Sequence, residues 1–378
     1  MTACPACGAS VGEGDRFCES CGSEVAKPTA AGGAGAPAAG GAGAPADGGA
    51  GVPGGRAATE SAPPCASCGA ALITADGYCD RCGRRQRAGR DHVEIDLGIA
   101  AGVSDRGRRH PDNEDAIALA RVDGSAVGAA VLAVVCDGVS SSVRAADASK
   151  AAAGTALAAM ARELKAGASA VAATRTAITE AAAAVAAIAG PVTGSAAAAG
   201  GADPPSSTYV SAVVTATDMT IGWVGDSRAY WLAGGATGTA PTAQLTTDDS
   251  WAAAMVASGA LTEAAAYADE HAHAISAWLG ADAGQVRPHV AVTEPGGPGV
   301  AIVCSDGLWN YLPEAAALAG AAMPQAAQDP LLAARHLLRI ALEAGGSDNI
   351  TVAVIPFPPP QAPANTDDTA TPVRGPHD

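Results

Sequence analysis

The sequence predicts an α+β protein: an antiparallel β-sandwich flanked by helix pairs and preceded by two small cysteine-rich units. Strand-like runs follow one another without a regular strand–helix alternation, which argues against a parallel sheet. Long alanine-rich helical segments occur in neighbouring pairs. Eight of the ten cysteines fall within the first 82 of the 378 residues, so this part of the chain has its own organisation.

The eight N-terminal cysteines form two copies of one pattern. Each copy has two Cys-x-x-Cys pairs separated by ten residues, so four thiolates can surround one ion tetrahedrally. A disulfide framework is the alternative, but it requires an oxidising compartment, and we expect no export signal. Because units this small bury no core, metal is expected to hold their fold. The predicted ligands of two structural Zn²⁺ ions are Cys4, Cys7, Cys18, Cys21, Cys65, Cys68, Cys79 and Cys82.

Composition sets the expected domain boundaries. Zinc ribbons are expected over residues 1–25 and 64–88, joined by a flexible linker over 26–63 that is almost entirely Ala, Gly and Pro. A globular domain is expected over residues 93–356. The remaining residues, 357–378, are rich in Pro, Thr and Asp and predict a disordered tail.

The expected strands of the globular domain are runs of β-branched and apolar residues bounded by turn signals. Thr217 and Asp218 separate two of these runs and suit a hairpin turn. The runs cover residues 93–103, 126–136, 209–217, 220–224, 229–232, 286–292, 300–304 and 350–355.

Three helices are expected in the same domain. Two of them cover residues 143–165 and 169–188, both alanine-rich and ended near a glycine. A third begins with Asp329 as N-cap and Pro330 in the first turn, and it stops at Gly345-Gly346. Strands joined by hairpins, with helices in pairs, predict the sandwich architecture.

Charge and hydropathy argue against several classes of partner. The formal net charge is −16, from 38 acidic and 22 basic residues, which opposes general binding to nucleic acid or to an anionic membrane. No run approaches the roughly 18 consecutive apolar residues of a membrane span. We therefore expect a cytoplasmic protein without a membrane or nucleic-acid partner.

Carboxylates recur where strands are expected to end. Asp137-Gly138 follows an apolar run directly, and Asp306-Gly307 follows another through Ser305. A single Asp-Gly is usually a plain turn. Several in one domain, two of them ending hydrophobic strands, favour a site for hard divalent cations, because such ions prefer clustered oxygen ligands.

Five motifs occur in order between about residues 93 and 355, and together they resemble the metal-dependent (type 2C, PPM) Ser/Thr protein phosphatase family. The motifs are Gly102-Val103-Ser104-Asp105-Arg106-Gly107 leading to Asn113-Glu114-Asp115-Ala116, then Asp137-Gly138, Gly225-Asp226-Ser227-Arg228-Ala229-Tyr230, Ser305-Asp306-Gly307-Leu308-Trp309 and Ser347-Asp348-Asn349-Ile350-Thr351-Val352.

The resemblance implies a phosphatase acting on phosphoserine and phosphothreonine. Two Mg²⁺ or Mn²⁺ ions would bridge a hydroxide that attacks phosphorus in line, without a phosphoenzyme. Cys136 and Cys304 are then buried strand residues rather than nucleophiles. The implied partners are phosphoprotein substrates and a Ser/Thr kinase system, with the zinc ribbons serving targeting or regulation.

The resemblance also implies a role for each acidic residue. Asp137 would bridge both ions, and the Gly138 carbonyl would bind one of them. Asp306 and Asp348 would complete the ligands of the second ion, and Asp115 would hold water in the outer shell. Asp203 is the candidate for a third metal ion, and Asp226 is expected to be a structural carboxylate near the site.

The chain departs from the family pattern at three places. Val139-Ser140-Ser141-Ser142 stands where the family usually has Gly-Gly-His, so the histidine that some members use as general acid is absent. The position of the phosphate-binding arginine falls on His110. We expect Arg109 to reach the phosphate, with His110 as the alternative. The flap lacks an arginine that is common there, and His271 and His273 near it are expected to be surface residues.

Two other functions remain open from the sequence. A pseudophosphatase would keep the fold as a regulatory binding module, but Asp137, Asp306 and Asp348 are all present. A zinc-ribbon regulator that binds nucleic acid would need aromatic platforms. The ribbons have only Phe17 and Tyr78, and the net charge opposes this function.

Overall fold

The computed structural model describes residues 2–3, 10–11, 91–189, 203–234 and 240–360. The chain divides into two compact units, Met1–Ala88 and Gly89–Asp378. In the first unit, β1 (Thr2–Ala3) pairs antiparallel with β2 (Ser10–Val11). The predicted zinc-binding cysteines, the linker and residues 361–378 of the predicted tail lie outside the described residues.

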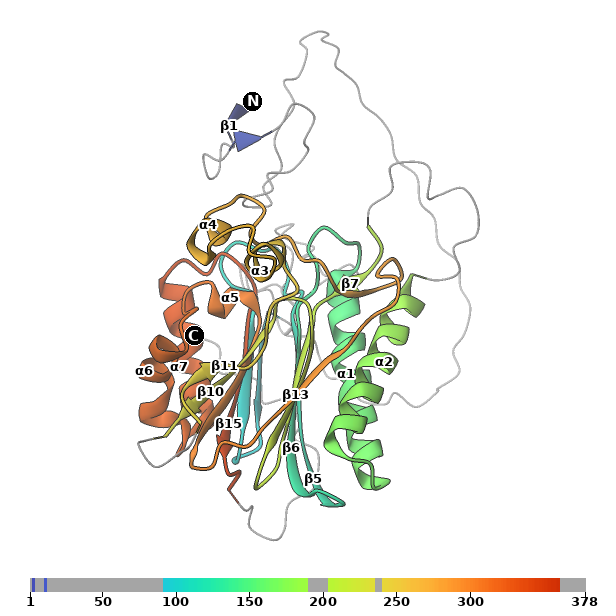
Figure 1. The fold of residues 1–378 in the computed structure, drawn as a ribbon, viewed down its shortest axis with the longest axis vertical. Coiled ribbons are helices and arrows are strands. Elements are labelled where there is room, and N and C mark those ends of the chain that lie inside the picture. Colours follow the sequence, from blue (N-terminus) through green and yellow to red (C-terminus); the bar gives the residue numbers. More distant parts are fainter. Residues whose placement is uncertain (1, 4–9, 12–90, 190–202, 235–239, 361–378) are drawn as a thin grey trace, which may run out of the picture. The chain divides into compact units, whose positions relative to one another are not determined.

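Two antiparallel sheets form the centre of the second unit (Figure 1). The five-stranded sheet has the order β13 (His289–Thr293), β9 (Met219–Val224), β8 (Tyr209–Val214), β6 (Gly128–Cys136) and β5 (Ala116–Ser125). The six-stranded sheet has the order β11 (Ala243–Gln244), β10 (Arg228–Ala233), β14 (Gly299–Cys304), β15 (Ile350–Phe357), β4 (Ala101–Asp105) and β3 (His92–Asp96). A separate short pair joins β7 (Ser206–Ser207) to β12 (Leu279–Gly280).

Alternating side chains on the strands build a core on both faces of each sheet. Along β6, Val131, Ala133 and Val135 belong to the core between the sheets, whereas Leu132 and Val134 face the helix layer. Strand β15 alternates in the same way between the inter-sheet core and the opposite helix layer. Because both faces are buried, these strands read as continuous apolar runs in the sequence.

Helix pairs cover the outer faces of the sandwich (Figure 1). α1 (Ala145–Lys165) and α2 (Ala170–Ile188) pack on the five-stranded sheet. α6 (Ala315–Ala326) and α7 (Pro330–Glu343) pack on the six-stranded sheet. The shorter helices are α3 (Trp251–Ala257), α4 (Glu263–Tyr267) and α5 (Asp306–Trp309).

Side-chain caps begin helices α2 and α7, and the cap by Asp329 is the predicted one. The Ser169 hydroxyl accepts a bond from the Ala172 amide at the start of α2, and Asp329 Oδ1 accepts one from the Leu332 amide at 2.8 Å at the start of α7. Among the described helices, α2 alone is long and apolar enough to cross a membrane. One of its faces is buried against α1 and the sheet.

The predicted sandwich with paired helices is confirmed, and four differences concern single elements. The run 93–103 is a hairpin rather than one strand, because the chain turns between β3 and β4, where the Leu97 amide donates to the Ala100 carbonyl. Strand β5 was not predicted, since Arg121 and Asp123 interrupt its apolar pattern. Helix α6 was also missed, and β15 continues to Phe357.

Candidate metal centre

Four carboxylates meet at one edge of the sandwich. Asp115 precedes β5 and Asp137 follows β6, and these strands pair with Ala116 opposite Cys136. Asp306 follows β14 and Asp348 precedes β15, and these strands pair with Cys304 opposite Val352. Antiparallel register therefore places the end of one strand beside the start of its neighbour in both sheets. The predicted convergence of Asp137, Asp306 and Asp348 follows directly from this pairing.

The carboxylates destabilise one another's charged form. Burial raises the pKa of Asp137 well above its ordinary value, and the charges of Asp115, Asp306 and Asp348 add to the rise. Burial also raises the pKa of Asp306, with further contributions from Asp348, Asp226 and Asp115. The pKa of Asp115 rises to about 7, mainly because its carboxyl group is buried. Clustered, desolvated carboxylates of this kind need a cation to remain ionised near neutral pH.

Two carboxylate oxygens in this cluster have no hydrogen-bond donor in the described residues. Asp115 Oδ2 accepts a bond from the Ser305 hydroxyl at 2.8 Å, and Asp306 Oδ2 accepts one from the Asn310 amide at 3.2 Å. The other oxygen of each carboxylate is buried without a partner. An all-oxygen donor set with free buried lone pairs fits Mg²⁺ or Mn²⁺.

The cluster is not arranged as a finished coordination shell. Within the described ranges, no group of three His, Cys, Asp or Glu side chains has the spacing of a complete metal site. The carboxylates thus lie at one edge and influence one another's charge without converging on a single point. Like charges that face one another repel, which opposes closer approach of the bare side chains.

The backbone around Asp137 is held firmly. Its carbonyl accepts bonds from the Thr208 amide at 2.8 Å and the Ser207 hydroxyl at 2.9 Å. The next residue is Gly138, where a Cβ would lie 2.7 Å from the carbonyl oxygens of Glu114 and Ala145. Only glycine fits at this crossing, which explains the Asp-Gly pair physically.

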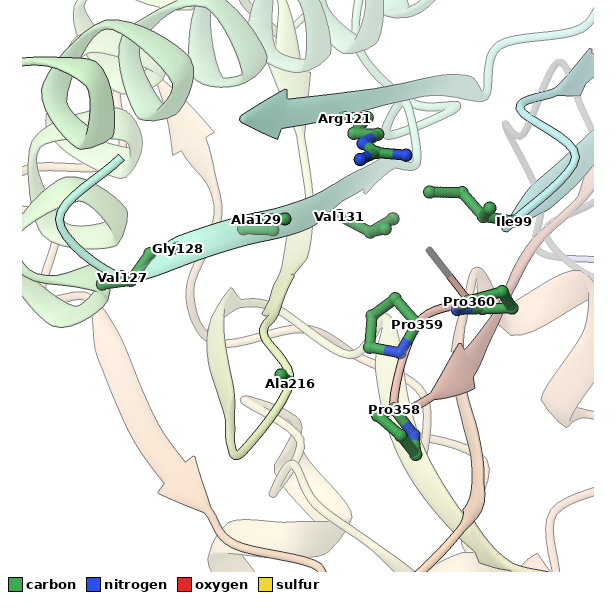
Figure 2. A pocket seen from close by; sticks show the side chains of 11 residues that line it. Ile99, Arg121, Val127, Gly128, Ala129, Val131, Ala216, Pro358, Pro359 and Pro360 are labelled. Carbon is green, nitrogen blue, oxygen red and sulfur yellow. The ribbon is translucent and has the colours of Figure 1, made fainter. Parts of the chain in front are cut away.

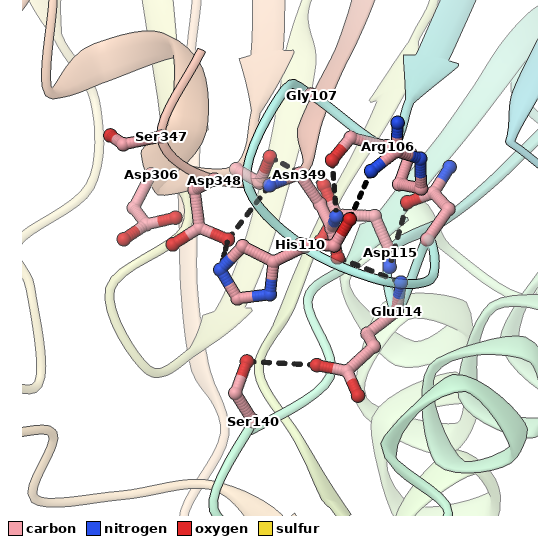
Figure 3. A network of polar contacts seen from close by, with 12 residues as sticks. Arg106, Gly107, His110, Glu114, Asp115, Ser140, Asp306, Ser347, Asp348 and Asn349 are labelled. Atoms are coloured by element: carbon pink, nitrogen blue, oxygen red, sulfur yellow. Dashed lines mark hydrogen bonds and ion pairs between the residues drawn. The ribbon is translucent and has the colours of Figure 1, made fainter. Parts of the chain in front are cut away.

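One amide side chain joins the segments that carry the site (Figure 3). Asn349 Nδ2 donates to the carbonyls of Arg106 at 2.8 Å and Asp112 at 3.0 Å, and its Oδ1 accepts from the Glu114 amide at 2.7 Å. Asn349 thereby fixes the loop before β5 against the start of β15. Sequence reasoning gave Asn349 no role, although it lies next to the predicted ligand Asp348.

The same loop brings His110, rather than Arg109, against the acidic cluster. His110 Nε2 lies 3.2 Å from Asp348 Oδ1, and Figure 3 shows the imidazole beside that carboxylate. The Arg106 guanidinium donates to the His110 carbonyl and pairs with Asp91 at 3.3 Å, which fixes the turn. Arg109 is exposed on the described surface.

A glutamate and a serine line the neighbouring part of the site. The Ser140 hydroxyl donates to Glu114 Oε2 at 2.8 Å (Figure 3). Burial raises the pKa of Glu114, and the Ser140 bond opposes the rise. Ser140 belongs to the segment that departs from the Gly-Gly-His pattern, so this segment still contacts the site through a hydroxyl group.

Asp203 and Asp226 have different surroundings. Asp203 is exposed, and its carbonyl accepts a bond from the Val143 amide at 2.9 Å. Asp226 is buried, and burial followed by the Asp248 charge raises its pKa to about 7. Its own carbonyl accepts a bond from the Trp309 indole at 2.9 Å, which ties it to the helix that carries Asp306.

A buried ion pair joins the segment before α3 to strand β10, near the sandwich edge that carries the four carboxylates. Arg228 Nη2 lies 2.6 Å from Asp248 Oδ2, and the Arg228 guanidinium also stacks over Trp309 at 3.6 Å from the ring centroid. His273 is exposed and stacks on the same tryptophan, while His271 pairs with Asp269 at 2.9 Å. Both histidines therefore have local partners on the surface.

The two described cysteines are buried strand residues. Cys136 and Cys304 end β6 and β14, and neither is bonded to another cysteine. Burial raises the pKa of both thiols, which disfavours the reactive thiolate. This setting agrees with a packing role.

Comparison with known proteins identifies the class of this domain and of the N-terminal unit. The PPM Ser/Thr phosphatase MsPP from Mycobacterium smegmatis, solved in complex with cacodylate, is 27% identical with a TM-score of 0.52, covering 68% of this chain and 97% of that chain. The catalytic domain of PstP in complex with two manganese ions is 23% identical with a TM-score of 0.50, covering 70% and 99%. The double zinc ribbon family matches residues 4–83.

The second unit thus has the fold of the PPM Ser/Thr phosphatases. Among curated proteins, the chain is 30% identical over 131 residues to the serine/threonine protein phosphatase PstP of Mycobacterium tuberculosis. That match covers 35% of this chain and 23% of the relative, so the chain spans less than a quarter of the relative's length. The resemblance predicted from the five motifs is confirmed.

Proposed function

We propose that this protein is a metal-dependent protein Ser/Thr phosphatase that hydrolyses phosphoserine and phosphothreonine. The observation that carries the proposal is the group of four carboxylates at one sandwich edge, each followed or preceded by a buried strand. Two of their buried oxygens lack a hydrogen-bond partner among the described residues. Homology to PPM phosphatases, one of which is described with two manganese ions, supports the same activity.

Two Mg²⁺ or Mn²⁺ ions fit this donor set. Asp137 and the Gly138 carbonyl would hold one ion, and Asp137, Asp306 and Asp348 would hold the other. When bound, such ions lower the pKa of water and offset negative charge on a phosphoryl group. Asp115, already bonded to Ser305, would orient water through its remaining oxygen. We propose Asp203 as the place of a weaker third ion.

The loop before β5 is the proposed contact for the phosphoryl group. His110 faces Asp348 and can donate a ring N–H to a phosphoryl oxygen, while Arg109 is exposed and remains the alternative contact. Glu114 and Ser140 are hydrogen-bonded to each other and can hold a water or the hydroxyl of the leaving group. These residues would stand in for the absent Gly-Gly-His element.

The N-terminal unit is proposed to bind two structural zinc ions through its eight cysteines and to serve targeting or regulation. The family match over residues 4–83 supports this proposal. We further propose phosphoproteins as substrates, a Ser/Thr kinase system as the opposing activity, and the cytoplasm as the location.

Steady-state hydrolysis of p-nitrophenyl phosphate and a phosphothreonine peptide tests the phosphatase proposal. Activity should rise with Mn²⁺ or Mg²⁺ concentration and disappear on chelation. Asp137→Asn should lower kcat by at least about a thousandfold, whereas Asp147→Asn on the exposed start of α1 should leave it unchanged. Wild-type activity in Asp137→Asn would refute the assignment of the four carboxylates as the catalytic metal centre. Mn²⁺ binding without turnover in the wild type would identify a pseudophosphatase instead.

Elemental analysis tests the zinc proposal separately. A fragment of the first 90 residues should contain two zinc ions, and Cys65→Ser in that fragment should reduce the content to one. If the fragment contained no zinc and its spectrum were still that of a folded unit, the assignment of structural zinc would be wrong.

A further inference from the structure

A recess lies at the end of the sandwich opposite the carboxylates. Strand β6 reaches Asp137 at its C-terminal end and this recess at its N-terminal end, about 27 Å away at the rise of an extended strand. Strand β15 starts beside Asp348 and leads into the same recess at its far end. The recess has a volume of about 470 Å³, within the range of small-molecule sites.

Both sheets contribute to the walls of this recess (Figure 2). The five-stranded sheet supplies residues of β5, β6 and the turn between β8 and β9, and the six-stranded sheet supplies the turn between β3 and β4. The chain leaving β15 closes one side with three consecutive prolines. The lining residues are Ile99, Arg121, Val127, Gly128, Ala129, Ala130, Val131, Ala216, Pro358, Pro359 and Pro360.

Arg121 is the one charged residue in this lining. Its Nε and Nη2 both donate to Asp123 Oδ1, at 3.0 and 2.7 Å. Its Nη1 is buried and has no acceptor among the described residues. Figure 2 shows the guanidinium beside the pocket-lining part of β6, facing Ile99. The side chain as a whole is 24% exposed, so the solvent-facing part of the guanidinium remains open to an anionic group in the recess.

The rest of the wall is apolar. Ile99, Ala130 and Val131 are almost fully buried, and Pro358 to Pro360 present rigid rings toward the same space (Figure 2). Such a surface gains free energy by covering hydrocarbon, while a single cation at its margin selects the charge of the ligand's polar end.

We propose that this recess binds an amphipathic organic carboxylate. The carboxylate accepts from the solvent-accessible part of the Arg121 guanidinium, beside Asp123, and the hydrocarbon part packs against Ile99, Val131 and the prolines. Because the two sheets share the walls, the ligand bridges them and stabilises the domain by mass action. This proposal is independent of the phosphatase assignment.

Two dyes of matched shape test the proposal on the full chain. Anilinonaphthalene sulfonate is anionic, and N-phenyl-1-naphthylamine is its neutral counterpart. The anionic dye should bind one site saturably and should bind Arg121→Met about tenfold more weakly, because one charge-assisted bond is lost. Arg162→Met, which removes an exposed arginine of α1, should bind it like the wild type. The neutral dye should bind all three proteins equally.

Decanoate identifies the ligand class in the same assay. It should displace the anionic dye and raise the melting temperature of the wild type, and decyltrimethylammonium should do neither. Ala216→Trp, which fills the mouth from an exposed turn, should weaken both dyes. Equal binding of the anionic dye to wild type and Arg121→Met, or unchanged binding to Ala216→Trp, would overturn the proposal.

Discussion

The acidic cluster should lower the stability of the cation-free domain in a pH-dependent way, and Asp115→Asn should reveal it. The pKa of Asp115 is about 7 in the folded protein against an ordinary value of 3.8. At a pH between these two pKa values, Asp115 is therefore protonated in the folded protein and ionised in the unfolded chain. Stability falls as pH rises through this window, and the full penalty remains above pH 7.

The size of the effect follows from the same two values. The pKa difference lowers the free energy of unfolding by about 4 kcal/mol at pH 8 and by about 2 kcal/mol at pH 5.5. Asparagine cannot ionise, and its carbonyl oxygen can still accept the Ser305 hydroxyl bond. Asp115→Asn should consequently raise the free energy of unfolding by up to about these amounts when no divalent cation is present.

Urea unfolding followed by tryptophan fluorescence measures this directly, because all five tryptophans belong to the second unit. The control is Asp147→Asn, whose carboxylate is exposed on α1 and should show no such pH-dependent gain. A stabilisation of Asp115→Asn that is equal at pH 5.5 and pH 8, or a loss of stability at both, would refute the electrostatic reasoning.

Three further experiments probe other parts of the site. His110→Ala should raise KM for a phosphopeptide about tenfold, while Arg109→Ala should change it less than about twofold; the reverse order in steady-state kinetics would favour Arg109. Arg228→Met should cost about 3–5 kcal/mol in urea unfolding, because it leaves Asp248 buried without its partner, and adding Asp248→Leu should recover much of the loss. Gly307→Ala should cost about 3 kcal/mol by the same measurement, since its Cβ would lie 1.8 Å from the Asn349 carbonyl oxygen; wild-type stability would contradict that clash.

The acidic residues of the site were predictable because each carries a local signal. Asp137-Gly138 and Asp306-Gly307 follow apolar runs, and a carboxylate at the end of a buried strand is uncommon enough to notice. Their convergence needed one more step, the antiparallel pairing of β5 with β6 and of β14 with β15. Turn residues predicted only one hairpin, between β8 and β9.

The uncharged residues that organise the site could not be predicted in this way. Asn349 contacts backbone groups 235 to 243 residues away in the sequence, and Ser305 contacts a carboxylate 190 residues away. Nothing in their immediate neighbourhood indicates those partners. The orientation of His110 is likewise tertiary, because Arg106 and Asp91 fix the loop that carries it.

The place of β15 in its sheet has a consequence for biosynthesis. This strand, the last that the structure describes, lies between β14 and β4 and leads out of the segment with Asp348 and Asn349. A nascent chain that has not yet released residue 350 from the ribosome leaves two unpaired sheet edges and an unfastened loop. The ability to bind divalent cations at this edge should therefore arrive late and abruptly during translation.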